Sequence, residues 1–447
     1  SNVNSGIIMG NLTGATIKNL DFTNIKLTDN GKYNSSKGLF SSINYSELDH
    51  VHLQNVELYA TQYVGSLAYS ITNSEVKNCS VSNAKLYNIP YEGNTYIGGM
   101  FAQTGNVQLK NCYTTGIDIY ADNPDLTKTL GFGGMSGYSY SSSRYENCYA
   151  VGKIKGLSYN GGLIGFGDPL ILKCYTKVDI EADGDENGGM VATSSTSTVI
   201  ENSLSLGNFI IATENPLHTH RLLATQNYWY VNNNYGYEWQ TLNQSQFKNP
   251  ENSLDVPYRD DASGVLSYEQ LCSEGAYTNT VRMGNSYDYS MISNGRLPWL
   301  KDTNGNLMPY QEDTFLYDGT VRIDVAEARK IEDTSTDINH FYTDIRVYHP
   351  GYDVVSVTLD GMQVNDDGIV TTVVNEGSLT KYEINSIPSM ALDVYRARVK
   401  LVSKSDSNNQ IEILATINYG DPVYWTIRNA SEWQTLMATH GETNENF

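Results

Sequence analysis

The chain of 447 residues contains no run of eighteen apolar residues, and we therefore expect no membrane insertion. Basic residues are scarce, because 29 Lys and Arg face 50 Asp and Glu and leave a formal net charge of −21. Nucleic-acid binding depends on clustered Lys and Arg that contact phosphates, so the sequence predicts no nucleic-acid partner. An acidic surface of this kind favours a protein that stays monomeric in solution.

The patterns of cysteine and histidine that hold catalytic metals are also missing. The five Cys form no close C-x2-C pair, which a tetrathiolate zinc site uses. The seven His form no H-E-x-x-H motif, which excludes a zinc hydrolase of that type. His50-x-His52 and His218-x-His220 each place two imidazoles on one strand face, and we favour surface side chains over an adventitious metal site.

Two segments are rich in oxygen-bearing side chains, ADGDEN at 182–187 and DTNGN at 302–306. Calcium prefers oxygen ligands, but in DTNGN the glycine stands at the wrong position for an EF-hand loop. We interpret both segments as turns and keep structural calcium as the weaker alternative. We expect no cofactor.

The sequence does contain an internal repeat. A small residue recurs with an apolar residue directly after it, and a second inward position follows ten to fourteen residues later. Period-two alternation between turn residues predicts strands, and strands that recur once per repeat stack as coils of a solenoid. We predict an all-β chain whose residues 1–225 form a right-handed parallel β-helix. The two columns are Gly6, Gly38, Ser66, Gly99, Gly134, Gly162 and Gly189, and Leu20, Val51, Cys79, Cys112, Cys148, Cys174 and Ser203.

Four cysteines occupy the second column, one in each of four successive coils, and we interpret them as small buried packing residues. Asparagine precedes this column in five coils, where it suits a bend and can pass hydrogen bonds from coil to coil. These bend residues are Asn19, Asn78, Asn111, Asn147 and Asn202.

Charged residues on the outside test the same register. Equal charges on neighbouring coils would repel, whereas opposite pairs contribute roughly 0.2–1 kcal/mol each. One predicted column alternates in sign without a break, and a second has a single like-charge step. The columns are Lys26, Glu57, Lys85, Asp118, Lys155 and Asp179, and Lys18, Asp49, Lys77, Lys110, Glu146, Lys173 and Glu201.

Tyrosine is unusually common, with 34 Tyr against 10 Phe, and it is the aromatic residue that tolerates a wet surface. Tyr113, Tyr149 and Tyr175 directly follow three of the column cysteines and should point outward in successive coils. We call them the tyrosine ridge and predict that they are exposed as a ligand-binding surface. Cross-strand aromatic pairing alone is the alternative explanation.

The remaining chain changes character twice. We predict irregular last coils and a terminal cap of the β-helix over 226–312, including a short helix after the Ser-x-x-Gln capping box at Ser267. About seven strand-like segments over 313–423 predict an immunoglobulin-like β-sandwich. We interpret 424–447 as the start of a further, truncated module, and the whole sequence as part of a longer protein.

Short motifs carry a family resemblance. GGLIG at 161–165, with GGMFA, GGMSG and GGMVA in other repeats, resembles the GLUG-type repeat of bacterial surface proteins. With LPWLKDTNGNLMP at 297–309, it is also similar to the N-terminal repeat region of Gram-positive IgA1-specific zinc metallopeptidases. The resemblance implies an extracellular protein at the cell surface or cell wall of a bacterium. It carries over no catalytic residue, because the zinc motif is missing from this chain.

Three functions follow as hypotheses. The first is a non-catalytic fragment for adhesion, display or ligand binding, with a host protein or a glycan as partner. The second is the non-catalytic substrate-recognition region of a large secreted IgA1-type zinc metallopeptidase. The third is a carbohydrate-active β-helix enzyme, which the pairing of outward carboxylates with lysines disfavours because it raises no carboxyl pKa.

Overall fold

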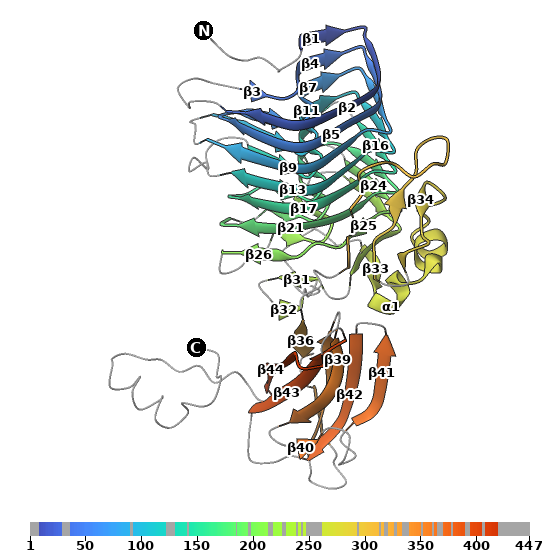
Figure 1. The fold of residues 1–447 in the computed structure, drawn as a ribbon. Coiled ribbons are helices and arrows are strands. Elements are labelled where there is room, and N and C mark those ends of the chain that lie inside the picture. Colours follow the sequence, from blue (N-terminus) through green and yellow to red (C-terminus); the bar gives the residue numbers. More distant parts are fainter. Residues whose placement is uncertain are drawn as a thin grey trace, which may run out of the picture. The chain divides into compact units, whose positions relative to one another are not determined.

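The computed structural model divides the chain into two compact units, Ser1–Leu316 and Tyr317–Phe447, each described by itself (Figure 1). The sequence predicted the boundary between the β-helix and the sandwich between residues 312 and 313, and the structure has it after Leu316. The structure describes residues 9–28, 36–89, 93–121, 130–140, 143–184, 186–194, 198–212, 218–225, 229–237, 240–242, 245–246, 262–292, 295–312, 314–316, 321–325, 329–332, 339–349, 352–359, 362–363, 370–376, 379–388, 394–404 and 407–418. The predicted module at 424–447 lies outside these residues.

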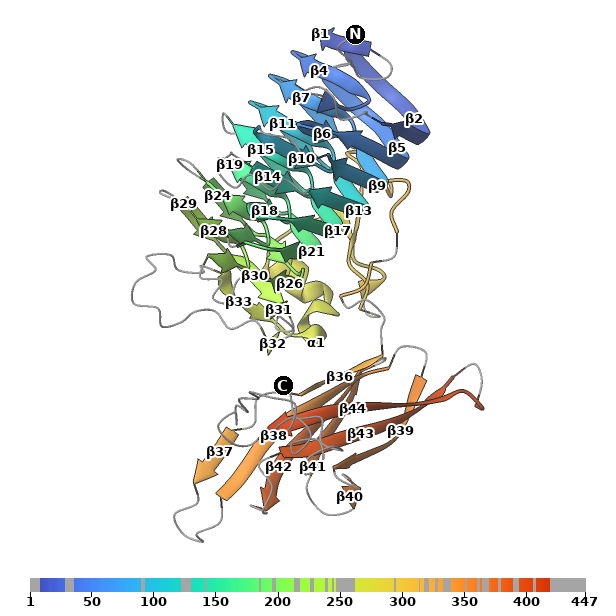
Figure 2. The same cartoon turned by 90° about the vertical axis from the view of Figure 1, so that its left-hand side faces the viewer.

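Residues 11–266 form a parallel β-solenoid, which confirms the predicted architecture (Figure 2). In three sheets, the strands of each regular coil pair in parallel with their counterparts in the neighbouring coils, and β31 and β32 near the end form an antiparallel pair. The first sheet holds β1 (Met9–Thr13), β4 (Phe40–Asn44), β7 (Ala68–Thr72), β11 (Phe101–Gly105), β15 (Ser136–Tyr140), β19 (Ile164–Gly167), β23 (Val191–Thr193) and β28 (Leu223–Thr225). The second holds β3 (Ser36–Lys37), β6 (Tyr63–Gly65), β10 (Thr95–Gly98), β14 (Leu130–Gly133), β18 (Asn160–Gly161), β22 (Asn187–Gly188) and β27 (Thr219–His220).

The third sheet is the broad one that positions the sites below. Within this sheet the chain bends sharply once in each coil, and we call this bend the corner. Most coils therefore contribute one strand before the corner and one after it. Its members are β2 (Thr16–Leu27), β5 (Glu47–Ala60), β8 (Glu75–Lys77), β9 (Ser80–Asn88), β12 (Gln108–Lys110), β13 (Tyr113–Ala121), β16 (Arg144–Glu146), β17 (Tyr149–Gly156), β20 (Leu170–Leu172), β21 (Tyr175–Ala182), β24 (Thr198–Glu201), β25 (Leu204–Ser205), β26 (Phe209–Ile211), β29 (Trp229–Asn232), β30 (Asn234–Tyr237), β31 (Thr241–Leu242), β32 (Ser245–Gln246) and β33 (Ala262–Leu266).

The solenoid interior contains the predicted inward columns. Cys79, Cys112, Cys148 and Cys174 are fully buried in one continuous apolar cluster, which confirms that they are packing residues. Burial raises the pKa of the Cys79 and Cys148 thiols well above its usual value, so these thiols stay protonated. Leu20 of the same column is 41% exposed, because it lies in the first described coil and no described coil covers it.

The corner of the third sheet has the turn geometry predicted for its asparagines. Every corner residue has a φ of 50–55°, the left-handed region that asparagine tolerates best after glycine. Side chains link the corners of neighbouring coils, as in the 3.1 Å bond from Asn147 Nδ2 to Asn111 Oδ1. The corner residues are Asn19, His50, Asn78, Asn111, Asn147, Lys173, Asn202 and Asn233.

The small-residue column has a direct steric cause. A Cβ on Gly134 would lie 2.1 Å from the carbonyl oxygen of Gly162 in the next coil, and one on Gly162 would lie 2.0 Å from that of Gly189. Neighbouring coils therefore approach closely along this column, and only a residue without a Cβ fits at these two positions.

The outward charges follow the predicted stacking with two corrections. Lys85 pairs in register with Glu57 on one side and Asp118 on the other, and Lys26 Nζ lies 2.8 Å from Glu57. The next member after Asp118 is Lys153 and not the predicted Lys155.

In this pair of strands the register shifts between Thr114 and Ile117, so that β13 has one more residue than β17 before the column and Asp118 faces Lys153. In the second column Leu172 replaces the predicted Lys173, which occupies the corner instead. The sign alternation of the first column survives, since Lys153 faces Asp179.

After the regular coils, the predicted irregular coil and helix are both present. β29 and β30 pair in parallel with β24 and β25, so the aromatic segment around Trp229 does form one more coil. The helix α1 (Tyr268–Leu271) begins with the predicted capping box: Gln270 N donates to Ser267 Oγ at 3.1 Å, and Ser267 N donates to Gln270 Oε1 at 2.8 Å. A short π-helix, η1 (Ala276–Thr280), follows.

The second unit is a β-sandwich of two antiparallel sheets. Its sheet orders, β36-β38-β42-β41 with β37 beside β38, and β40-β39-β43-β44, match the A-B-E-D and C′-C-F-G orders of an immunoglobulin fold. All seven predicted segments contain a strand, and β37 and β40 are additional. The strands are β36 (Arg322–Val325), β37 (Arg329–Glu332), β38 (Asn339–Tyr348), β39 (Tyr352–Leu359), β40 (Met362–Gln363), β41 (Val370–Glu376), β42 (Leu379–Pro388), β43 (Val394–Ser403) and β44 (Gln410–Asn418). Among the described residues of the whole chain, no helix is both long and apolar enough to cross a membrane.

The close approach along the glycine column gives a testable prediction. Gly134→Ala should destabilise the solenoid by about 1–3 kcal/mol, because the added methyl overpacks the contact with the next coil. Gly10→Ala is the matched control, since a Cβ there meets nothing within 4 Å. Thermal unfolding followed by circular dichroism should show a lower Tm for Gly134→Ala alone, and equal Tm values would contradict the steric explanation.

Candidate functional site

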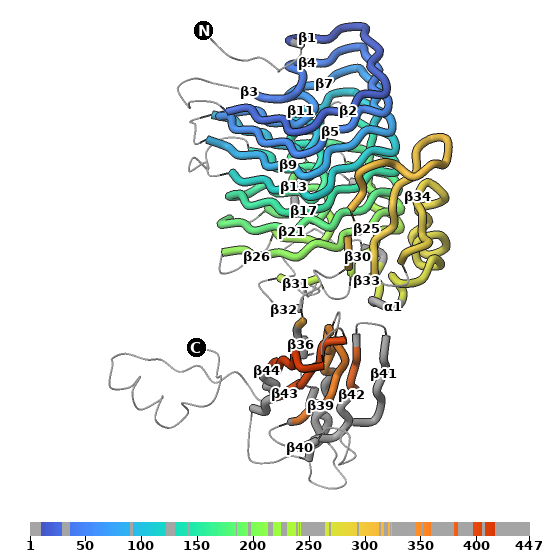
Figure 3. The backbone as a smooth tube through the Cα atoms, viewed as in Figure 1, coloured from blue at the N-terminus to red at the C-terminus, as the bar shows by residue number. Residues whose placement is uncertain are grey.

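A hairpin from outside the solenoid repeats crosses the start of several strands in the third sheet. We call residues 298–311 the strap, which follows β34 (Tyr287–Asp288) and includes β35 (Trp299–Leu300) (Figures 1 and 3). It reaches coils that are far apart: Tyr175 donates to Pro298 O at 2.9 Å, and Thr303 N donates to Asn78 Oδ1 at 3.0 Å. The prediction that this segment caps the end of the solenoid is therefore wrong, because it runs along the flank instead.

The strap also corrects the prediction of an exposed tyrosine ridge. Tyr113, Tyr149 and Tyr175 do stack in register, with ring centroids 4.9 and 4.6 Å apart. All three are buried, at 0–2% exposure, and burial raises the pKa of each hydroxyl. The sequence places these rings on the outside of the coil, but it does not reveal that a segment more than a hundred residues later covers them.

The strap holds the ridge through hydroxyl groups. Tyr149 donates to Gln311 Oε1 at 3.0 Å, and Tyr113 donates to the carbonyl oxygen of Pro309. Tyr287 extends the stack, with its ring 5.8 Å from Tyr175. The ridge is therefore an anchor for the strap, and in this structure it offers no surface to a ligand.

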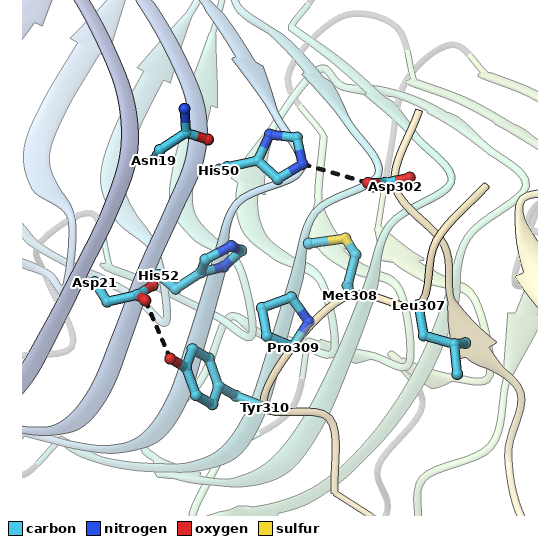
Figure 4. Close-up of a pocket in the computed structure, with 9 residues that line it drawn as sticks. All are labelled: Asn19, Asp21, His50, His52, Asp302, Leu307, Met308, Pro309 and Tyr310. Carbon is cyan, nitrogen blue, oxygen red and sulfur yellow. Dashed lines mark hydrogen bonds and ion pairs between the residues drawn. The ribbon is translucent and has the colours of Figure 1, made fainter. Parts of the chain in front are cut away.

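The ridge belongs to a longer outward column whose first members are smaller. Asp21 pairs in register with His52, His52 with Ser80, and Ser80 with Tyr113. Under the strap, the tyrosines fill the space completely, whereas Asp21 and His52 leave it partly open. The result is a pocket of about 290 Å³ (Figure 4).

The pocket lies between β2 and β5 on one side and the strap on the other. Polar groups from both sides line it, together with apolar side chains of the strap (Figure 4). Its lining consists of Asn19, Asp21, His50, His52, Asp302, Leu307, Met308, Pro309 and Tyr310.

His50 connects the solenoid corner to the strap. Its Nδ1 lies 2.8 Å from Asp49 Oδ1, and its Nε2 lies 3.5 Å from Asp302 Oδ2. Its ring also meets the ring of His52 edge to face, with centroids 6.3 Å apart. Two carboxylates therefore bracket this imidazole, which ties the tip of the strap to the second coil.

His52 is nearly buried at 5% exposure, so the prediction of a surface side chain is wrong for this residue. Its Nδ1 lies 2.8 Å from Ser80 Oγ, and its ring meets Tyr310 of the strap edge to face at 5.9 Å. Burial lowers the pKa of His52, while the nearby Asp21 carboxylate opposes that shift. The neutral imidazole is thus favoured at neutral pH.

The second histidine pair does not form a comparable site. His220 lies in β27 and is 1% exposed, which again contradicts the predicted surface position. For His52 the burial comes from the strap, a segment that the local alternation of the sequence does not reveal.

Two carboxylates in the pocket have different environments. Tyr310 donates to Asp21 Oδ2 at 3.2 Å. Asp302 accepts bonds from the backbone N of Asn304 and of Asn306, each at 2.8 Å, and these bonds lower its pKa. Asp302 therefore closes a turn within DTNGN, in agreement with the interpretation of that segment as a turn.

Across the described ranges, no group of three or more His, Cys, Asp or Glu side chains is arranged to hold a metal ion. The pocket offers hydrogen bonding through carboxylate and imidazole acceptors and a phenol, and it offers apolar contact through strap side chains. Such a set can recognise a polar group that carries donors.

The sequence analysis missed a second set of tyrosines on the same sheet. Tyr59, Tyr87 and Tyr120 pair in register near the ends of β5, β9 and β13, and we call them the tyrosine row. The signal was present, because the row follows the charge column at a fixed offset in the segments ELY, KLY and DIY. Tyr120 is 38% exposed.

Comparison of the chain with protein-family models, with curated proteins and with solved structures finds no match. What is established about this chain is therefore its architecture, a parallel β-solenoid.

The covered ridge predicts a stability effect that an exposed ridge would not show. Tyr149→Ser should cost about 3–5 kcal/mol, because it removes a buried aromatic ring between two stacked neighbours. Tyr45→Asn is the control, since Tyr45 is 64% exposed and its φ of 47° suits asparagine. Denaturant unfolding of both variants measures this difference, and two equally small effects would show that the strap does not cover the ridge.

The lowered pKa of His52 predicts how stability depends on pH. Between the folded pKa and the ordinary value of 6.5, the unfolded chain binds more protons, so unfolding becomes easier as the pH falls through this window. Above the window the stabilisation is complete. His52→Gln should flatten the loss of stability between about pH 7.5 and pH 5.5 in denaturant unfolding.

The buried His349 of the sandwich also has a lowered pKa, and it is present in both proteins. Its contribution therefore cancels when the variant is compared with the parent chain. An unchanged pH slope in His52→Gln would mean that His52 titrates alike in the folded and unfolded chain.

Proposed function

We propose that this chain is a non-catalytic binding scaffold of a secreted or cell-surface bacterial protein. In this proposal, the pocket beneath the strap holds a polar group of a host protein or a glycan. The observation that carries the proposal is the pocket, where carboxylates, imidazoles and a phenol from three separate segments converge beside apolar strap side chains. The extracellular location rests on the resemblance of the repeats to GLUG-type surface proteins.

The construction of the site supports binding by a rigid surface. Asp21 and His52 lie on neighbouring strands of a hydrogen-bonded sheet, so their spacing is fixed by the coil repeat. Tyr310 is fixed from the other side, because its carbonyl oxygen accepts a bond from Ser82 Oγ at 3.1 Å. Groups that are held in place before binding lose little entropy when a ligand arrives.

The pKa of Asp302 bears on the carbohydrate-active alternative. Glycoside hydrolysis uses one carboxylic acid with a raised pKa as a proton donor. Asp302 is held ionised by its turn, since its pKa is lowered. Asp302 is therefore unsuited to donate that proton and suited to accept hydrogen bonds from a ligand.

A second proposal is the substrate-recognition region of a large secreted IgA1-type zinc metallopeptidase. The observation that favours it is that the segment similar to those proteins, LPWLKDTNGNLMP at 297–309, supplies most of the strap and four of the nine residues that line the pocket. The two proposals share the binding role. An H-E-x-x-H motif in the same gene, downstream of this region, would select the second.

The binding proposal predicts a loss of affinity when the pocket is altered. Tyr310→Ser removes the phenol and the ring that meets His52, and should weaken binding to the ligand found on a panel of immobilised glycans and host extracellular proteins by about tenfold or more. Asp21→Asn keeps the size of the side chain and removes its charge, and should weaken binding as well.

Tyr45→Asn serves as the control, because Tyr45 is an exposed solenoid tyrosine that does not line the pocket. It should bind as the parent chain does. Binding that is unchanged in both pocket variants, or absent from the whole panel, would refute the proposed function.

A further inference from the structure

The strap covers only the start of the strands that it crosses. The tyrosine row and the charge column lie near the ends of β5, β9 and β13, and in Figure 1 the arrowheads of these strands point away from the strap. After Tyr120, the row continues in register with Lys155 and then Glu181. This half of the sheet therefore presents a tyrosine row followed by an ion pair.

Within the row, most ring faces are already occupied. Tyr59 and Tyr87 are stacked face to face, with centroids 4.6 Å apart and planes 13° from parallel. Lys26 Nζ lies over the ring of Tyr59, 6.0 Å from its centroid. A ligand that stacks on an aromatic face finds little room at these two rings.

Tyr120 differs from the other two. Its ring is tilted by 53° from that of Tyr87, at a centroid distance of 6.4 Å. The next coil offers Lys155 at the corresponding position, so no aromatic ring extends the stack beyond Tyr120. The row thus ends in a partly exposed ring.

A small hollow adjoins Tyr120. Lys155 and Glu181 form an ion pair in it, and both side chains are about half exposed. The hollow has a volume of about 40 Å³, and its lining consists of Tyr120, Ala121, Lys155, Gly156, Leu157, Glu181, Ala182 and Asp183. It therefore combines an aromatic wall, an ammonium donor and carboxylate acceptors.

The charges around this site nearly balance. Lys85, Asp118, Lys153 and Asp179 alternate in the neighbouring column, Lys155 is paired with Glu181, and Asp183 adds one further carboxylate to the lining of the hollow. A surface on which most charges have a close opposite neighbour gives little net attraction to a polyanion or a polycation. Aromatic area together with both donors and acceptors suits an uncharged ligand with many hydroxyl groups.

We propose that Tyr120 and the hollow beside it bind a pyranose ring of a neutral glycan. The apolar face of the sugar lies against the Tyr120 ring, and its hydroxyl groups exchange hydrogen bonds with Lys155, Glu181 and Asp183. This site is separate from the strap pocket and does not share a residue with it.

The test uses the whole chain and four soluble neutral tetrasaccharides, built from glucose in α- and β-linkage, from mannose and from N-acetylglucosamine. Saturation-transfer difference NMR should show transfer to at least one of them. Tyr120→Ser should weaken that binding by about tenfold, whereas Tyr120→Trp, which keeps an aromatic face, should preserve it. Because Tyr120 is partly exposed, both variants should keep the parent Tm.

Salt and pocket variants separate this inference from the proposed function. Binding of a neutral sugar should change little between low and high salt, and Tyr310→Ser should not affect it. No transfer to any tetrasaccharide, equal binding by Tyr120→Ser, or a steep salt dependence would overturn the inference. Those outcomes leave the strap-pocket proposal standing, just as a failure of the Tyr310 and Asp21 variants would leave this one standing.

Discussion

Backbone hydrogen bonds between neighbouring coils hold each residue about 4.8 Å from its counterpart in the next coil, and the rest of the structure depends on this register. It turns a repeat in sequence into columns in space, so that one kind of side chain recurs along the whole flank. The glycine contact between Gly134 and Gly162, the buried cysteines, the left-handed corners and the alternating charges are four consequences of the same stacking. A shift of one residue would turn the core outward, which is why the columns are specific.

The strap packs along one of these columns. Where the column holds Tyr113, Tyr149 and Tyr175, the rings stack and their hydroxyls bond the strap. Where the same column holds Asp21 and His52, the smaller side chains leave the pocket. Along one column, the large tyrosines anchor the strap, whereas the smaller Asp21 and His52 leave a pocket that is open to a ligand.

Sequence reasoning predicted the solenoid, its register and the sandwich well, because each rests on a local pattern that repeats. It failed where a segment distant in sequence folds onto that pattern. The ridge tyrosines were placed correctly on the outside of the coil, yet the strap buries them. Lys155 was placed in the column position of Lys153, two residues earlier, in a strand whose register shift the sequence does not reveal. The segments ELY, KLY and DIY do indicate the tyrosine row. The sequence does not show, however, that the strap leaves this half of the sheet uncovered.

The sequence by itself determined which residues face inward, which face outward and which lie one above another, because alternation and spacing are properties of the chain. Only the tertiary structure decided which outward residues remain exposed. That depends on the docking of the strap, whose contacts join residues such as Asn78 and Thr303 that no repeat relates. Exposure is a property of all the segments that surround a residue, and a site for a ligand is defined by exposure.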